Sequence, residues 1–188
     1  MNCEIDLKNA LDVLRKGGVI LYPTDTIWGI GCDATNAEAV ARVYRIKQRE
    51  ESKALICLVD NPDRMQRYFR QIPDVAWDMA DYATTPLTLI LDGANGVAPN
   101  LIAEDGSLGM RVTREEFSRQ MCYKFQKPIV STSANISGEP APRCFADISE
   151  DIKSQVDYIV QFRRGEKAPK EASKIVKIKL DGEVTIIR

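Results

Sequence analysis

Apolar residues along this chain follow two different spacings, which predict alternating helices and strands. Between residues 6 and 16 they recur every three or four positions, as they do on one face of a helix. Apolar runs at 19–22 and 54–60 and the segment PLTLIL at 86–91 have the length of strands. The run at 54–60 also has the composition of a strand buried on both faces. The alternation of the two patterns predicts an α/β fold.

Caps, prolines and turn residues predict where the other elements begin and end. Two capping boxes, from Thr35 to Glu38 and from Thr113 to Glu116, should each open a helix, and the second helix should face the core with Phe117, Met121 and Phe125. We also expect strands at 28–33, 108–112, 128–134 and 158–162, a helix starting at Pro62, helices at 74–83 and 149–156, and a C-terminal hairpin turning at Asp181 and Gly182. Several strands follow one another too closely for crossover helices, so a mixed sheet is expected.

The composition is that of an ordinary globular domain without a strong overall charge. The 188 residues are 44% hydrophobic and 28% charged, and the formal net charge of −1 provides no general attraction to nucleic acid or membranes. The start lacks a secretory signal, and no apolar stretch approaches the ~20 residues of a membrane helix. Five scattered cysteines without a C-x-x-C pair predict reduced thiols in a cytoplasmic protein.

The chain has no histidine, and this absence excludes several kinds of active site. Nucleophiles activated by histidine, histidine metal sites and histidine general bases are all ruled out. Any reaction must therefore depend on lysine, arginine, carboxylate, hydroxyl or amide groups, or on a metal ion carried by the ligand.

The sequence Pro-Thr-Asp-Thr after the first strand combines hydroxyl groups and a carboxylate where a cleft could form. Thr24 and Thr26 could present their hydroxyls to a small polar ligand, or the four residues could form a proline-initiated turn. The glycines of residues 29–34 match a relaxed dinucleotide-binding motif, but they stand too far from the preceding strand and the following helix to support it. A P-loop motif is absent from the sequence.

Two further polar segments could form an anion site with these threonines. Lys47 and Arg49 stand at the end of a predicted helix, where cations are commonly solvated, but Lys47 shares a face with Val40, Val43 and Tyr44 and should point toward the sheet. Residues 131–138 are either a polar turn or a group of hydroxyl, amide and backbone N–H donors suited to phosphate oxygens. Together, the two cations and these donors could bind a polyanion.

An ordered set of motifs runs through the chain: YPTDTIWGIGCDA, IKQRE, SKALI, PLTLIL, MRV and STSANISGEPAP. This set resembles the YrdC-like threonylcarbamoyl-AMP synthase family from about residue 6 to the C-terminus. The resemblance implies one YrdC-like catalytic domain over residues 1–188 without a second C-terminal domain, built on a twisted mixed sheet with a deep, positively charged cleft. It also implies synthesis of threonylcarbamoyl-AMP and pyrophosphate from L-threonine, bicarbonate or CO2, and ATP, for modification of the tRNA adenosine next to the anticodon.

The resemblance implies roles for individual residues. Catalysis would involve the K-x-R pair Lys47 and Arg49 and the S-x-N pair Ser133 and Asn135. Threonine would be bound by Thr26, Ser133 and Ser173. The nucleotide would be bound by six residues: Arg49, Lys53, Arg111, Asn135, Arg143 and Arg188. Lys47→Ala and Arg49→Ala are expected to abolish turnover and leave the fold intact, because both residues stand at a helix end rather than in the core.

The resemblance also implies a cofactor and partners. Mg²⁺ would arrive with ATP rather than on protein ligands, and the product would pass to a downstream tRNA threonylcarbamoyl transferase machinery. The chain departs from the family at residues 83–85, where W-P-G is common, and at Ser173 and Lys174, where a serine–threonine pair is common. Leu58 and Glu115 stand at variable positions, and no threonine contact is expected from them.

An RNA-binding module of the same fold without independent catalysis is the alternative function. It is motivated by seven Lys/Arg against two Asp/Glu between residues 163 and 179, and it would include weak binding of tRNA. A solvated connector accounts for the same charges and is favoured. A relative active in carbamoyl transfer or hydrogenase maturation is a third interpretation, but the zinc-finger cysteines of such proteins are not in this sequence.

Overall fold

The computed structural model describes residues 3–50, 55–166 and 172–188. Its helices are α1 (Cys3–Arg15), α2 (Ala37–Lys47), α3 (Pro62–Gln66), α4 (Asp74–Tyr82), α5 (Glu116–Phe125) and α6 (Glu150–Lys153), with 3₁₀ turns at Pro99–Leu101 and Phe145–Asp147. Its strands are β1 (Ile20–Tyr22), β2 (Gly29–Gly31), β3 (Ile56–Val59), β4 (Leu87–Leu91), β5 (Leu108–Val112), β6 (Ile129–Ser133), β7 (Tyr158–Ile159), β8 (Lys174–Ile178) and β9 (Val184–Ile186). Within these ranges, no helix is long and apolar enough to cross a bilayer.

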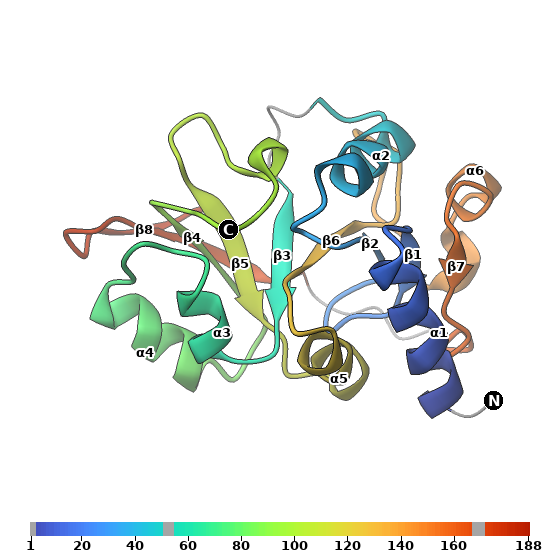
Figure 1. Cartoon of the computed structure of the whole chain (residues 1–188), viewed down its shortest axis with the longest axis horizontal. Helices are drawn as coiled ribbons and strands as arrows, with labels where there is room; N and C mark the ends of the chain where they lie inside the picture. Colours follow the sequence, from blue (N-terminus) through green and yellow to red (C-terminus); the bar gives the residue numbers. More distant parts are fainter. Residues whose placement is uncertain (1–2, 51–54, 167–171) are drawn as a thin grey trace.

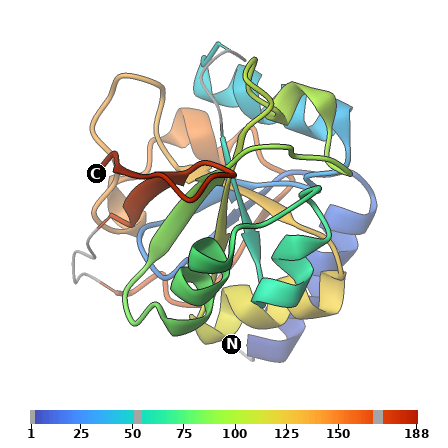
Figure 2. The ribbon, with the colours of Figure 1, turned by 90° about the vertical axis from the view of Figure 1, so that its left-hand side faces the viewer.

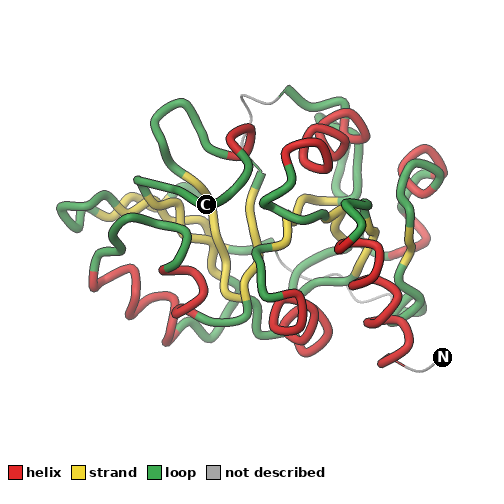
Figure 3. The backbone as a smooth tube through the Cα atoms, in the orientation of Figure 1, coloured by secondary structure: helices red, strands yellow, loops and turns green. Residues whose placement is uncertain are grey.

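The strands form one mixed sheet in the order β7-β1-β2-β6-β3-β5-β4-β8-β9. The pairs β1–β7, β3–β5 and β4–β8 are parallel, and the other neighbours are antiparallel. Helices α1, α3, α4 and α5 gather along one side of the sheet and α2 lies on the other (Figures 1 and 2). The predicted α/β fold with a mixed sheet is therefore confirmed, and Figure 3 shows how the helices surround the strands.

The buried faces of the helices follow the predicted periodicity. In α2, Val40, Val43, Tyr44 and Lys47 are all buried, and α5 buries its predicted apolar face in the same way. The C-terminal hairpin pairs β8 with β9 as predicted. These features depend only on side-chain spacing and local turn chemistry, which the sequence displays directly.

The exact helix caps differ from the prediction, because the predicted threonines are engaged elsewhere. Asn36, not Thr35, caps α2, its side chain accepting from the second and third backbone N–H groups of the helix. Thr35 instead donates its hydroxyl to Asp33 at 2.7 Å. Glu115, not Thr113, caps α5. The buried Thr113 hydroxyl instead lies 2.7 Å from the hydroxyl of Ser118. Both predicted helices are therefore present, but both predictions of the capping residue are wrong.

Two glycines of β2 allow the strand to pack closely against its neighbours. A Cβ atom on Gly31 would lie 2.5 Å from the carbonyl oxygen of Val130, and one on Gly29 would lie 3.3 Å from that of Thr132. The register pairs Gly29 with Ser133. These glycines therefore permit a close strand contact rather than a phosphate loop, and they bring the segment after β1 beside the end of β6.

Candidate functional site

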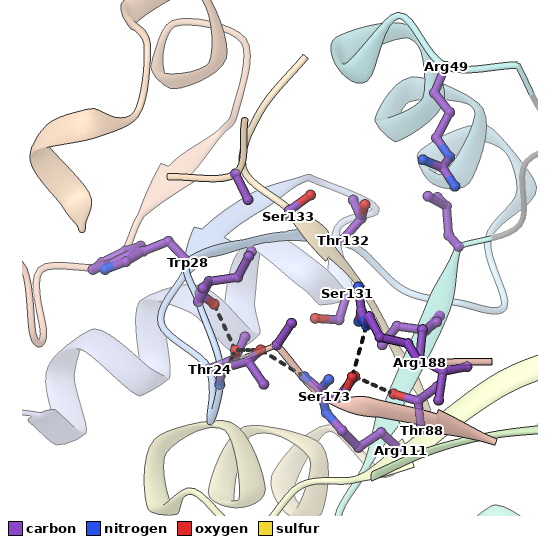
Figure 4. A pocket seen from close by; sticks show the side chains of 18 residues that line it. Thr24, Trp28, Arg49, Thr88, Arg111, Ser131, Thr132, Ser133, Ser173 and Arg188 are labelled. Carbon is purple, nitrogen blue, oxygen red and sulfur yellow. Dashed lines mark hydrogen bonds between the residues drawn. The ribbon is translucent and has the colours of Figure 1, made fainter. Parts of the chain in front are cut away.

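A cavity of about 320 Å³ lies where β1, β2 and β6 meet the central strands and the C-terminal hairpin. Side chains from segments far apart in the sequence converge on it (Figure 4). Six of the predicted site residues line the cavity: Thr26, Arg49, Arg111, Ser133, Ser173 and Arg188. The convergence of cations and hydroxyl groups anticipated from the motifs is therefore present in the structure.

The segment between β1 and β2, residues 23–27, forms a polar elbow at one end of the cavity. Thr24 and Thr26 are 3% and 6% exposed, and their hydroxyl oxygens lie 3.0 Å apart. The Thr24 hydroxyl also donates to the carbonyl of Ile27 at 2.7 Å and accepts from the backbone N–H of Thr26 at 3.0 Å. The turn prediction and the ligand-binding prediction are thus compatible, because the turn itself presents Thr26 to the cavity.

Arg111, from the central strand β5, lies against this elbow. Its Nη2 pairs with the Asp25 carboxylate at 2.9 Å and donates to Thr26 Oγ1 at 3.4 Å. The side chain is 3% exposed, and its Nε has no hydrogen-bond partner within the part of the chain that the structure describes. A buried, unused N–H beside a cavity suits an anionic oxygen of a ligand. The predicted nucleotide residue Arg111 therefore stands at the same end as the predicted threonine contact Thr26.

Lys47 lies beside the serine–asparagine pair, but its ammonium donates its hydrogen bonds to oxygen atoms of that pair. Nζ donates to the carbonyl oxygens of Ser133 at 2.6 Å and Asn135 at 2.8 Å, and to Asn135 Oδ1 at 3.4 Å. Burial and the nearby Arg49 charge lower the pKa of Lys47 to about 8. The expectation that this residue stands outside the core is wrong, since its side chain is 1% exposed.

The loop after β6 is held to the end of α2 by further hydrogen bonds. The backbone N–H of Ser137 donates to the carbonyl of Lys47 at 2.8 Å. Asn135 Nδ2 donates to the carbonyls of Ile136 and Glu139, at 3.1 and 2.7 Å. Asn135 thus organises the loop, while Ser133 lines the cavity.

The C-terminal segment closes the other wall of the site. Ser173 is 5% exposed, and its hydroxyl lies 3.0 Å from that of Thr88 on β4. Arg188 Nε donates to the Ser173 carbonyl at 3.2 Å. Figure 4 shows Ser173, Thr88 and Arg111 together, well apart from Arg49. The cavity therefore has a hydroxyl-rich end and an end marked by Arg49, where the left-handed Gln48 (φ 49°) terminates α2.

Three predicted nucleotide residues, Lys53, Asn135 and Arg143, are not placed in the lining of this cavity. Lys53 lies outside the described residues. Arg143 is exposed and lines a small neighbouring space of about 20 Å³, together with Arg163 and Glu166. This space shares Thr24, Thr26 and Trp28 with the main cavity.

Several cavity residues were not identified from the sequence. They include Trp28 and Thr88, which line the cavity, and the neighbouring Asp25, which pairs with Arg111. Trp28 and Asp25 stand within the recognised elbow motif, so proximity in sequence could have indicated them. Thr88 stands within the recognised motif PLTLIL, but only the pairing of β4 with β5 places it near Arg111.

Three of the five described cations between residues 163 and 179 form ion pairs with carboxylates. Arg163 pairs with Glu115 at 3.1 Å and with Glu166 at 2.6 Å. Arg164 lies over the ring of Phe145, 4.6 Å from its centroid. Lys177 and Lys179 also form ion pairs. The expectation of a solvated connector is wrong for its first two arginines, and the paired charges do not favour an RNA surface.

The cavity is suited to holding anions and hydroxyl-bearing ligands. Arg49, Arg111 and Arg188 supply positive charge, and Ser131, Ser133 and other hydroxyls supply neutral donors and acceptors. Among the described residues, no group of three or more Asp, Glu, Cys or His side chains could hold a metal ion. The chemistry available is therefore charge compensation and positioning by arginine, hydroxyl and backbone groups.

Comparisons with known proteins agree with this arrangement. The model of the Sua5/YciO/YrdC family, described as "Telomere recombination", matches residues 12–188. A threonylcarbamoyl-AMP synthase of Pseudoalteromonas translucida is 33% identical over 163 residues, which cover 85% of this chain and 87% of that protein.

Two solved structures have the same fold. E. coli YciO has a TM-score of 0.84 and 24% identity, and the match covers 100% of this chain and 89% of that one. P. abyssi Sua5 complexed with L-threonine also has a TM-score of 0.84 and 24% identity over 97% of this chain. The present chain spans 53% of that Sua5 chain, about half its length.

Proposed function

Because the chain belongs to the Sua5/YciO/YrdC family, we propose that it is an L-threonylcarbamoyladenylate synthase. It converts L-threonine, bicarbonate or CO2, and ATP into threonylcarbamoyl-AMP and pyrophosphate, which makes it a nucleotidyltransferase. The observation that carries this proposal is the single cavity in which Thr26, Arg111 and Ser173 stand at one end and Arg49 at the other. Relatives named for the same activity, about 30% identical over most of the chain, support it.

The hydroxyl-rich end is assigned to threonine. The unused Nε of Arg111 suits the carboxylate of an amino acid, and Thr26 and Ser173 suit its polar hydrogens. The P. abyssi Sua5 structure, with the same fold, contains L-threonine. An amino acid at this end would leave the rest of the cavity to the nucleotide.

The end marked by Arg49 is assigned to ATP. Arg49 would compensate phosphate charge, and the Ser133 hydroxyl would orient the threonine toward the α-phosphate without adding charge. Mg²⁺ would be carried by the triphosphate, since the described residues offer no carboxylate cluster for it. When bound, the metal ion would neutralise the charge that develops on the leaving pyrophosphate.

The reaction joins two anions, so positioning and charge compensation are the main contributions of the protein. The threonine amine adds to CO2 and loses a proton to form a carbamate. A carbamate oxygen then attacks the α-phosphorus, and the bond to the bridging oxygen of the β-phosphate breaks, releasing pyrophosphate. Holding both reactants in one cavity contributes ~7–11 kcal/mol in favourable cases. No covalent enzyme intermediate is required, which is compatible with a chain without histidine.

The biological setting forms part of the proposal. Threonylcarbamoyl-AMP would serve a transferase that modifies the adenosine next to the anticodon of tRNA, in the cytoplasm. Direct binding of tRNA to this chain is not required, and Arg163, Lys177 and Lys179 of the basic segment are engaged in ion pairs.

Mass spectrometry of the product tests the reaction. Purified protein is incubated with ATP, L-threonine and ¹³C-bicarbonate, with pyrophosphate release followed in parallel. We expect a labelled threonylcarbamoyl-adenylate, and pyrophosphate only when threonine and bicarbonate are both present. Arg49→Met should fold normally and lose this activity. Pyrophosphate release that does not depend on threonine would refute the proposal.

A further inference from the structure

The elbow carries a chain of hydroxyl groups whose protons can be assigned from the distances. Thr24 Oγ1 lies 2.7 Å from the carbonyl oxygen of Ile27 and 3.0 Å from Thr26 Oγ1. A hydroxyl has one proton and two lone pairs, whereas a carbonyl oxygen can only accept. Two oxygen atoms at 2.7 Å attract each other only with a proton between them. Thr24 therefore donates its single proton to Ile27.

This assignment determines the direction of the other bonds in the chain. Thr24 Oγ1 accepts from the backbone N–H of Thr26 at 3.0 Å, and it has no second proton to donate. The contact between the two hydroxyls must then be donated by Thr26. Arg111 Nη2 donates to Thr26 Oγ1 at 3.4 Å. The donors thus point in one direction, from Arg111 through Thr26 and Thr24 to Ile27.

The Thr26 hydroxyl is consequently left with a lone pair and no proton for a ligand in the cavity that it lines. We propose that Thr24 makes Thr26 a hydrogen-bond acceptor, so that the elbow selects an amino acid that presents a neutral donor there, either a side-chain hydroxyl or a nitrogen-bound hydrogen. Thr24 is the positioning residue in this proposal, because it acts through Thr26. The inference rests on the proposed function, which supplies the amino acid substrate.

Charge around Thr26 supports a neutral donor. The Arg111 guanidinium that bonds to Thr26 is buried and paired with Asp25 at 2.9 Å. A cationic ammonium on the same threonine oxygen would face this guanidinium at close range in a buried site, where like charges repel strongly. A hydroxyl, or the N–H of a carbamate, avoids this repulsion.

The test compares three variants by calorimetric titration with L-threonine and, separately, with ATP. Thr24→Val keeps the shape of the side chain but removes the oxygen that receives the Thr26 proton. We expect it to weaken threonine binding roughly tenfold, the usual cost of a mismatched buried hydrogen bond, with ATP binding unchanged. Thr24→Ser should restore wild-type affinity. The matched control is Thr113→Val, which removes a buried hydroxyl paired with Ser118 outside the cavity and should not change threonine affinity.

A second amino acid distinguishes the two donors. If Thr26 accepts from the side-chain hydroxyl, Thr24→Val weakens threonine binding but not binding of L-2-aminobutyrate, which lacks that hydroxyl. If it accepts from the N–H of the carbamate, which forms when bicarbonate is present in the titration, both amino acids weaken by the same factor. Unchanged threonine affinity in Thr24→Val, or an equal loss of ATP affinity, would overturn the inference. Binding is measured without turnover, so a wild type that binds threonine but releases no pyrophosphate would defeat only the proposed function.

Discussion

Replacing Lys47 by methionine tests how this fold uses a buried lysine at the end of α2. The substitution nearly preserves the length of the side chain and removes its charge. An ammonium has three donors, and here all three are directed at oxygen atoms of Ser133 and Asn135. Lys47→Met should therefore destabilise the protein by freeing the end of β6 and the loop that follows it.

The magnitude can be worked from these contacts. Hydrogen bonds to charged groups stabilise proteins by ~1.5–3 kcal/mol each. The lower value applies to Lys47, because burial and the neighbouring Arg49 lower its pKa to about 8 and so oppose the charged form. The two short bonds then amount to about 3 kcal/mol, which corresponds to a fall in Tm of roughly 6–12 °C for a domain of this size.

Thermal and urea unfolding measure this loss, and Arg49→Met is the matched control. Arg49 is half-buried and lines the cavity, so its replacement should abolish turnover with little change in Tm. Lys47→Met should lose both turnover and stability. A Lys47→Met protein with the wild-type Tm would refute the argument that the ammonium holds β6 and the following loop to α2.

The remaining predictions concern ionisation and charge in the same cavity. Turnover should fall as the pH rises through about 8, because Lys47 loses the proton that supplies its third donor. A pH–rate profile flat to pH 10 would contradict this. Stability should change in the opposite direction. Between about pH 8 and 10.5 this lysine is protonated in the unfolded chain but not in the folded protein, so its ionisation adds to the free energy of unfolding as the pH rises. Asp25→Asn should lower the free energy of unfolding by roughly 3–5 kcal/mol in urea titrations, since it leaves Arg111 buried without its counter-ion; wild-type stability would count against the ion pair. Arg188→Met should raise the KM for ATP roughly tenfold or more in steady-state assays, as expected for the loss of the charge-assisted nucleotide contact that the resemblance implies. Because Arg188 Nε bonds to Ser173 at the end assigned to threonine, a raised KM for threonine with an unchanged KM for ATP would instead move Arg188 to the threonine end.

Local patterns in the sequence were sufficient for the buried faces of the helices and for the C-terminal hairpin. The periodic positions of α2 and α5 are buried as predicted, because helical spacing places them on one face whatever the partner. The caps were less predictable. Thr35 and Asn36 are both good capping residues, but the Thr35 hydroxyl donates to Asp33 instead of capping the helix. Asp33 in turn forms an ion pair at 2.7 Å with Lys127, which is 94 positions away in the sequence.

The candidate site was also predictable only in part from the sequence. The ordered motifs identified most of the residues that line the cavity, because each motif is a short segment whose chemistry is visible in its letters. They could not reveal that the Lys47 ammonium donates its hydrogen bonds to β6 and the loop after it. Nor could they reveal that Arg111 contacts the elbow through an ion pair with Asp25. Those contacts depend on which strands lie next to each other in the sheet.

The sequence by itself therefore determined the class of fold, the inward faces of its helices and the inventory of groups available for chemistry. Tertiary structure alone decided which of those groups still have a free donor or acceptor. The physical reason is that a hydrogen bond uses up a proton or a lone pair, and in a buried site the partner that uses it comes from a distant strand. Thr26 and Lys47 illustrate both outcomes: one keeps a lone pair facing the cavity, and the other directs all three donors at the protein.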